Sequence, residues 1–158
     1  MGLADLFFGK KQTQQPTGLL ALSNFGQGPT KQEIEDKTLD TISFLESSSD
    51  TNPKRLTKNS SGALGEFQLT EKLLIDIKRD FPEHKNVTFK EAALGSNRRE
   101  FARLGLESTS RNLSGLGVAP TRDAVIQAYH SGAGNVANNN IGPEGRDYLS
   151  KFNELIGK

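Results

Sequence analysis

Cysteine is absent from this chain of 158 residues, so neither a disulfide nor a thiol nucleophile can form. Histidine is scarce: only His84 and His130 occur, and no H-x-x-x-H pair brings two imidazoles to one helix face. The glycine-rich stretch at residues 131–140 lacks the lysine and the following serine or threonine of a phosphate-binding loop. We therefore expect no metal ion and no cofactor.

A long apolar run and an excess of charge of one sign are also missing. No stretch approaches the roughly 20 apolar residues of a membrane-spanning helix, and the N-terminal sequence MGLADLFFGKK lacks the basic front and cleavage site of a signal peptide. Twenty lysines and arginines oppose 19 aspartates and glutamates, which leaves a net charge of +1. Because such a chain has no overall positive field, we expect no nucleic-acid partner, and we expect no stable membrane insertion.

Helical periodicity accounts for most of the sequence that remains. Thr30 and Glu33 have the spacing of a capping box, Thr70 has the position of an N-cap, and Thr88 and Glu91 repeat the capping-box pattern. No alternating pattern is long enough to require a sheet. The sequence thus predicts an all-α fold, or α+β at most with one small hairpin in the segment 50–69. The expected helices cover residues 31–47, 71–80, 89–94, 97–113, 121–131 and a last stretch that begins near Pro143.

The chain divides into an arm and one domain. Residues 1–29 combine glutamine, glycine and proline around a short apolar island, a composition typical of a linker or a docking arm. Residues 30–158 contain all the expected helices and are enough for one domain with a continuous core. The turn-rich segment 50–69 interrupts these helices, and excursions of that length are usually functional or disordered.

Glu46 lies at the edge of the apolar face of the expected helix 31–47. Its neighbours Ile42 and Leu45 would remove water from the carboxylate, and the negative end of the helix dipole disfavours the ionised form. Both effects favour the protonated acid, which is the form that can donate a proton. Glu46 is therefore either a catalytic acid or a solvated residue at a helix end.

Three short motifs occur in the order seen in soluble lytic transglycosylases. They are ES at Glu46 and Ser47, GALGEFQL at residues 62–69, and AYHSGAGN at residues 128–135. The signatures of that family read E-S, then G-x-x-G-L-M-Q, then A-Y-N-x-G, so the chain resembles the family over about residues 31–156. The resemblance implies a lysozyme-like helical domain, similar in fold to goose-type lysozymes.

The resemblance also implies a role for each residue that matches a motif. Glu46 would be the catalytic acid, and Ser47 and Tyr129 would orient or support it. Two other interpretations stay open, with Ser47 as a capping serine at the helix end and Tyr129 as a core residue. The substrate-binding residues that the resemblance implies are Gln68, Phe67, His130 and Tyr148.

The chain departs from the family pattern at three positions. Phe67 replaces the usual methionine and would still offer an apolar wall to a sugar face. His130 replaces the usual asparagine and brings a titratable ring, which could narrow the active pH range. Glu66 replaces an aliphatic residue, and it either points to solvent or adds a second carboxylate to the groove.

The activity that the resemblance implies is that of a peptidoglycan lytic transglycosylase. Such an enzyme cleaves the β-1,4 bond between N-acetylmuramic acid and N-acetylglucosamine in a glycan strand and forms 1,6-anhydromuramic acid, with Glu46 as general acid and then as base. One alternative is a hydrolytic goose-type lysozyme, with Glu66 or Asp50 as a helper to water. Another is a catalytically inactive structural or docking protein of a virion with the same fold.

The absence of a signal peptide also bears on location. An enzyme that cleaves cell walls must reach them, and a phage virion or another delivery route to the bacterial periplasm or cell wall would provide access. In a virion, residues 1–29 would dock on other virion proteins.

Overall fold

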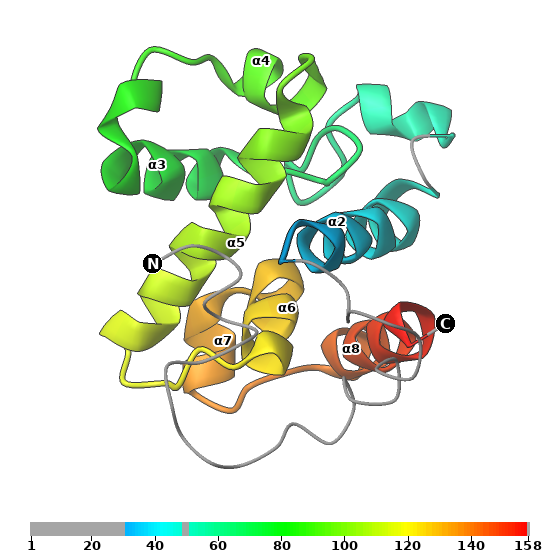
Figure 1. The fold of residues 1–158 in the computed structure, drawn as a ribbon, viewed down its shortest axis with the longest axis vertical. Coiled ribbons are helices and arrows are strands. Elements are labelled where there is room, and N and C mark those ends of the chain that lie inside the picture. Colours follow the sequence, from blue (N-terminus) through cyan, green and yellow to red (C-terminus); the bar gives the residue numbers. More distant parts are fainter. Residues whose placement is uncertain (1–30, 49–50, 158) are drawn as a thin grey trace.

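The computed structural model describes residues 31–48 and 51–157, and within them the fold is all-α (Figure 1). The single β pairing in this part of the chain is an isolated antiparallel bridge between Leu64 and Leu69. The expected arm at residues 1–29, the Thr30 cap and Asp50 lie outside the described residues. The helical elements are α2 (Lys31–Ser47), η2 (Pro53–Leu56), α3 (Glu71–Asp80), η3 (Pro82–His84), α4 (Phe89–Leu94), α5 (Arg98–Gly115), α6 (Arg122–Ser131), α7 (Ala133–Ala137) and α8 (Pro143–Ile156).

Threonine caps determine where three of the helices begin. The Thr70 hydroxyl accepts a hydrogen bond from the Leu73 amide, and the Thr121 hydroxyl caps α6 in the same way. Thr88 and Glu91 form the expected capping box at the start of α4. The predicted N-caps at Thr70 and Thr88 are therefore confirmed.

Helix α5 forms the centre of the molecule and contacts α2, α3, α4, α6 and α7. Figure 1 shows it running between α3 and α4 on one side and α6 and α7 on the other. Its buried residues divide between two hydrophobic clusters, because Phe101 and Leu104 pack with α3 and α4, whereas Ala102, Leu106 and Leu113 pack with α2, α6 and α8. One helix therefore joins two cores.

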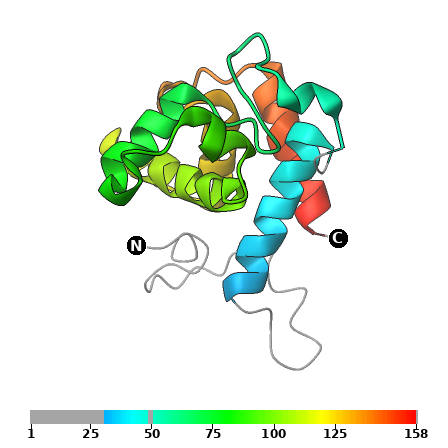
Figure 2. The ribbon, with the colours of Figure 1, turned by 90° about the horizontal axis from the view of Figure 1, so that it is seen from above.

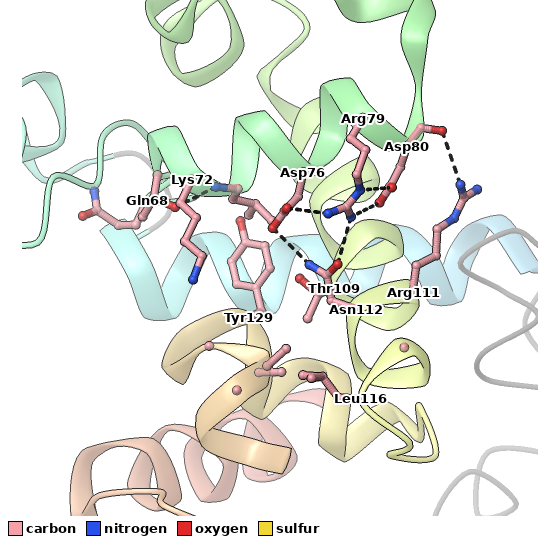
Figure 3. Close-up of a pocket in the computed structure, with 17 residues that line it drawn as sticks. Gln68, Lys72, Asp76, Arg79, Asp80, Thr109, Arg111, Asn112, Leu116 and Tyr129 are labelled. Atoms are coloured by element: carbon pink, nitrogen blue, oxygen red, sulfur yellow. Dashed lines mark hydrogen bonds and ion pairs between the residues drawn. The ribbon is translucent and has the colours of Figure 1, made fainter. Parts of the chain in front are cut away.

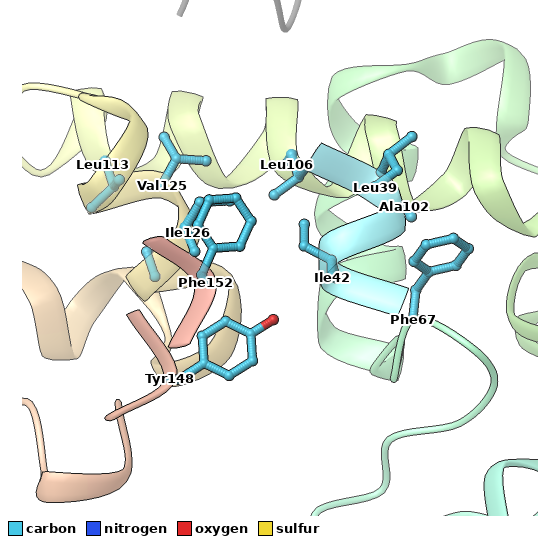
Figure 4. Packing of buried hydrophobic residues seen from close by; sticks show 11 residues of the cluster. Leu39, Ile42, Phe67, Ala102, Leu106, Leu113, Val125, Ile126, Tyr148 and Phe152 are labelled. Carbon is cyan, nitrogen blue, oxygen red and sulfur yellow. The ribbon is translucent and has the colours of Figure 1, made fainter. Parts of the chain in front are cut away.

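The larger cluster fixes the position of α2. Leu39 and Ile42 on α2 are buried in it together with Tyr148 and Phe152 on α8 (Figure 4). The view from above shows α2 lying beside α8, in agreement with their contacts (Figure 2). Because these residues recur at helical spacing along α2, the C-terminal end of α2 is held over the region where α6 and α8 meet.

The segment between η2 and α3 is a tight turn, where the sequence predicts a small hairpin. The amides and carbonyls of Leu64 and Leu69 exchange two hydrogen bonds of 2.9 Å each, and no longer ladder forms among the described residues. Asn59 organises the preceding turn, because its side-chain oxygen accepts from the amides of Ser61 and Ala63. Gly65 makes the turn possible, since it has φ +86° and a Cβ there would lie 2.1 Å from the Ala93 carbonyl oxygen.

The sequence analysis missed the short 3-10 helices η2 and η3 and the α-helix α7. Gly132, at φ +89°, does end α6 as expected, but the chain resumes a short helix at Ala133. Among the described residues no helix combines the length and apolar character needed to cross a membrane.

Candidate active site

Glu46 stands one residue before the end of α2, with its side chain 13% exposed. The helix ends there because Ser48 adopts a left-handed conformation with φ +54°, while its amide still donates to the Phe44 carbonyl at 2.9 Å. Such a φ is uncommon outside glycine. The carboxylate thus projects from the last turn of a helix into a largely buried position.

His130 and Tyr148 are neighbours of the Glu46 carboxylate. The Nδ1 atom of His130 lies 3.8 Å from Oε1 of Glu46, although the two residues are far apart in the sequence. The imidazole stacks on the Tyr148 ring, with centroids 4.2 Å apart and planes inclined by 13°. Three elements, α2, α6 and α8, therefore each contribute one side chain to this group, which we call the Glu46 cluster.

The Tyr148 hydroxyl is the buried polar group of the cluster. It forms no hydrogen bond of ordinary geometry among the described residues, and Glu46 is the side chain close enough to accept one. Burial raises the pKa of the phenol well above its ordinary value, and the nearby Glu46 carboxylate raises it further. Tyr148 therefore stays protonated at any physiological pH, and its hydroxyl is available as a hydrogen-bond donor in the cluster.

Tyr129 was expected to support Glu46, and its hydroxyl donates a hydrogen bond of 2.9 Å to the Phe67 carbonyl. Its hydroxyl lies inside the protein while part of the residue remains accessible. Burial, and secondly the charge of Glu46, raise the pKa of this phenol as well. Tyr129 is thus close enough to sense Glu46, and it also ties α6 to the turn that carries Gln68.

Ser47 is buried and donates a hydrogen bond of 3.1 Å to the Ser43 carbonyl. This bond runs back to the carbonyl four residues earlier, within α2, so the capping interpretation stays a prediction. That Ser47 supports Glu46, by holding the end of α2 in place, also stays a prediction.

Gln68 is held in an unusual conformation. Its φ is +48°, its Nε2 donates to the Gly65 carbonyl at 2.8 Å, and its Oε1 accepts from Asn59 at 2.9 Å. A left-handed non-glycine residue costs about 1 kcal/mol or more, so surrounding contacts must enforce it. Both ends of the amide are thus oriented by the turn, as a groove residue with a defined hydrogen-bonding direction requires.

Phe67 occupies a different place from the one expected. Its side chain is 3% exposed and packs between α2 and α5 in the larger hydrophobic cluster (Figure 4). The ring therefore stabilises the core and leaves no face open to a sugar. The reason is the turn itself, whose reversal at Gly65 directs Phe67 inward.

Glu66 neither points freely to solvent nor adds a free carboxylate to the groove. Its side chain is 14% exposed, its Oε1 accepts a hydrogen bond of 2.7 Å from the Ser43 hydroxyl, and its Oε2 pairs with Arg98 Nε at 2.7 Å. The interpretation that Glu66 is a solvated residue is therefore wrong. Its carboxylate joins the turn to α2 and α5, a role that the local sequence gave no sign of, because Arg98 lies 32 residues further along the chain.

Tyr129, which lies near Glu46, also lines a pocket of about 710 Å³ (Figure 3). Gln68 lines this pocket too, whereas Glu46, His130 and Tyr148 do not. It lies between α3 and the C-terminal part of α5 on one side and the α6–α7 turn on the other. Its charged lining residues are Lys72, Asp76, Arg79, Asp80 and Arg111.

Within the part of the chain that the structure describes, no three histidine or carboxylate side chains gather as a metal site would require. The chemistry available at the Glu46 cluster is that of proton transfer and hydrogen bonding. No protein-family model matches the sequence, and comparison with curated proteins and with solved structures finds no match either.

Proposed function

We propose that this protein is a peptidoglycan lytic transglycosylase with a lysozyme-like domain, in which Glu46 acts first as a general acid and then as a base. The observation that carries the proposal is the Glu46 cluster: a carboxylate 13% exposed, with His130 at 3.8 Å and Tyr129 nearby. The hydrogen bond from Tyr129 to the Phe67 carbonyl links this cluster to the turn that carries Gln68.

The first step needs a proton on the leaving glycosidic oxygen while the sugar carbon becomes cationic. Glu46 in its protonated form supplies that proton. The carboxyl group is 13% exposed and projects from the last turn of α2, so little water competes with a bound glycosidic oxygen for its proton. The Tyr148 hydroxyl, which has no other partner among the described residues, can donate to the carboxylate after the proton has left.

The second step does not require another carboxylate. The acetamido carbonyl of the muramic acid can shield the anomeric carbon, and ionised Glu46 then takes the proton from the 6-hydroxyl, which closes the 1,6-anhydro ring. Glu66 is unsuited to activate water because Arg98 and Ser43 occupy its oxygens. Asp50, the other helper considered, lies outside the described residues.

The glycan strand of peptidoglycan is the proposed partner, and the proposed location is a phage virion or the bacterial periplasm and cell wall. Residues 1–29 would then attach the enzyme to other virion proteins.

The direct test of Glu46 is Glu46→Gln, which keeps the shape of the side chain but cannot donate the proton. We expect release of soluble fragments from purified peptidoglycan to fall by about 10² to 10⁴, the usual contribution of a general acid. Glu154→Gln, at an exposed position on α8, is the matched control and should retain wild-type activity. Near wild-type release by Glu46→Gln would remove Glu46 from the mechanism.

A further inference from the structure

Three cationic side chains line the pocket, and they differ in whether an acidic side chain pairs with them. Arg79 is 2.9 Å from Asp76 and 2.8 Å from Asp80, and its guanidinium also donates to Asn112. Arg111 pairs with Glu107 at 2.8 Å. Lys72, by contrast, is exposed and forms no ion pair or hydrogen bond with any residue that the structure describes.

Lys72 lies in the first turn of α3, directly after the Thr70 cap. The partial positive charge of the helix N-terminus therefore adds to the charge of the ammonium group. In Figure 3 the Lys72 side chain points from α3 toward α6, and both Gln68 and Tyr129 line the same pocket. A positive charge without a direct partner thus faces the part of the pocket that Gln68 and Tyr129 line.

The wall opposite α3 is formed by Gly132, Ala133 and Gly134. A Cβ at Gly134 would meet no atom within 4 Å, and one at Gly132 would meet only the Asn135 amide at 4.0 Å. This wall consists of backbone and one methyl group, so an extended chain can approach it closely. The volume of about 710 Å³ falls within the usual range for a site that binds a small ligand.

We propose that this pocket binds the acidic peptide stem carried by the muramic acid, with Lys72 paired to a stem carboxylate. The inference rests on the proposed function and adds a preference within it, for peptide-bearing glycan over bare glycan. A sugar without its stem offers an ammonium group only the lactyl carboxylate, which stays next to the ring, whereas a peptide stem carries free carboxylates further along an extended chain. The stem is attached to the sugar that is cleaved, and Tyr129 both lines the pocket and lies near Glu46.

The test compares two substrates, peptide-bearing glycan strands and strands from which an amidase has removed the stems. We expect the wild-type protein to cleave the peptide-bearing strands with a KM about two- to fivefold lower, the size of a partly exposed ion pair. Lys72→Ala should abolish this preference and leave kcat unchanged, and Lys72→Glu should reverse it. Lys78→Ala is the matched control, on the same helix but outside the pocket, and should keep the preference.

Two results would overturn the inference and leave the proposed function intact. One is an unchanged preference in Lys72→Ala. The other is an equal rise of KM on both substrates, because stripped strands expose a lactyl carboxylate and Lys72 would then bind the sugar's own acid. Calorimetric titration of soluble, uncleaved fragments into Glu46→Gln, with and without Lys72→Ala, tests the site independently of catalysis. A two- to fivefold tighter binding of stem-bearing fragments that depends on Lys72 would support the site even where no strand is cleaved.

Discussion

Three side chains surround the Glu46 carboxyl group at the residue scale. The Nδ1 atom of His130 lies 3.8 Å from Glu46 Oε1, and the imidazole stacks on Tyr148. Burial raises the pKa values of Tyr148 and Tyr129, so both phenols stay neutral at physiological pH.

The substitution Glu66→Gln tests whether the Glu66 carboxylate has a structural or a catalytic role. The substitution removes the ion pair with Arg98 and weakens the bond from Ser43, so the free energy of unfolding should fall by about 1 to 3 kcal/mol in a denaturant titration. The chemical identity of the cleavage products should not change. A switch from anhydro to reducing ends, or the reverse, would instead place Glu66 at the reacting atoms.

At the scale of elements, the tight turn at residues 62–69 depends on backbone conformations that residues other than glycine rarely adopt. Gly62 and Gly65 both have positive φ, of +76° and +86°, but only Gly65 touches another segment, at the Ala93 carbonyl. A substitution at Gly62 therefore measures the free energy cost of the left-handed backbone alone. A substitution at Gly65 measures that cost together with the clash against the Ala93 carbonyl.

Gly62→Ala should cost about 1 kcal/mol of unfolding free energy, because only the left-handed conformation is strained. Gly65→Ala adds a steric conflict with Ala93 and should cost about 3 kcal/mol or more, with loss of cleavage as Gln68 is displaced. Chemical denaturation of both variants measures the difference. Equal costs would show that the approach to α4 does not constrain the turn.

Local signals predicted the elements well where one residue determines a boundary. Thr70 and Thr88 cap α3 and α4, and both helices have the predicted bounds. Helix α7 was missed because the glycines around Ala133 are typical of a helix end, and packing on α5 and α6 outweighs that preference. The expected hairpin shrank to one bridge because the sequence shows turn residues but not the number of paired ones.

The candidate site was predictable only in part. Glu46 and His130 are brought together as the motif order suggested, and Gln68 and Tyr129 line one pocket. The inward turn of Phe67 and the pairing of Glu66 depend on contacts with distant helices, which no local pattern encodes. Contacts between distant parts of the chain therefore decide where Glu66 and Phe67 point. A prediction from the sequence can use only the tendency of neighbouring side chains to point in opposite directions.

At the scale of the whole molecule, α5 joins two hydrophobic clusters, and the pocket opens along its C-terminal part. The smaller cluster carries α3 and the tight turn, and the larger one carries α2, α6 and α8. Glu46 lies on α2, which packs in the larger cluster, and Gln68 lies on the tight turn, between a residue of the larger cluster, Phe67, and one of the smaller, Leu69. A glycan strand bound at the Glu46 cluster would therefore contact elements packed in both hydrophobic clusters.

Mass spectrometry of the muramic acid ends that the purified protein releases from peptidoglycan tests this account most directly. Closure of the internal ring gives an end one water molecule lighter than hydrolysis does, so the two outcomes are separated at every cut. In the proposed mechanism the nucleophile is the 6-hydroxyl of the muramic acid, because Arg98 engages Glu66 and keeps it from activating water, and we predict predominantly 1,6-anhydro ends. Predominantly reducing ends would contradict the transglycosylase proposal and indicate a hydrolytic lysozyme, and a complete absence of cleavage would indicate a binding protein.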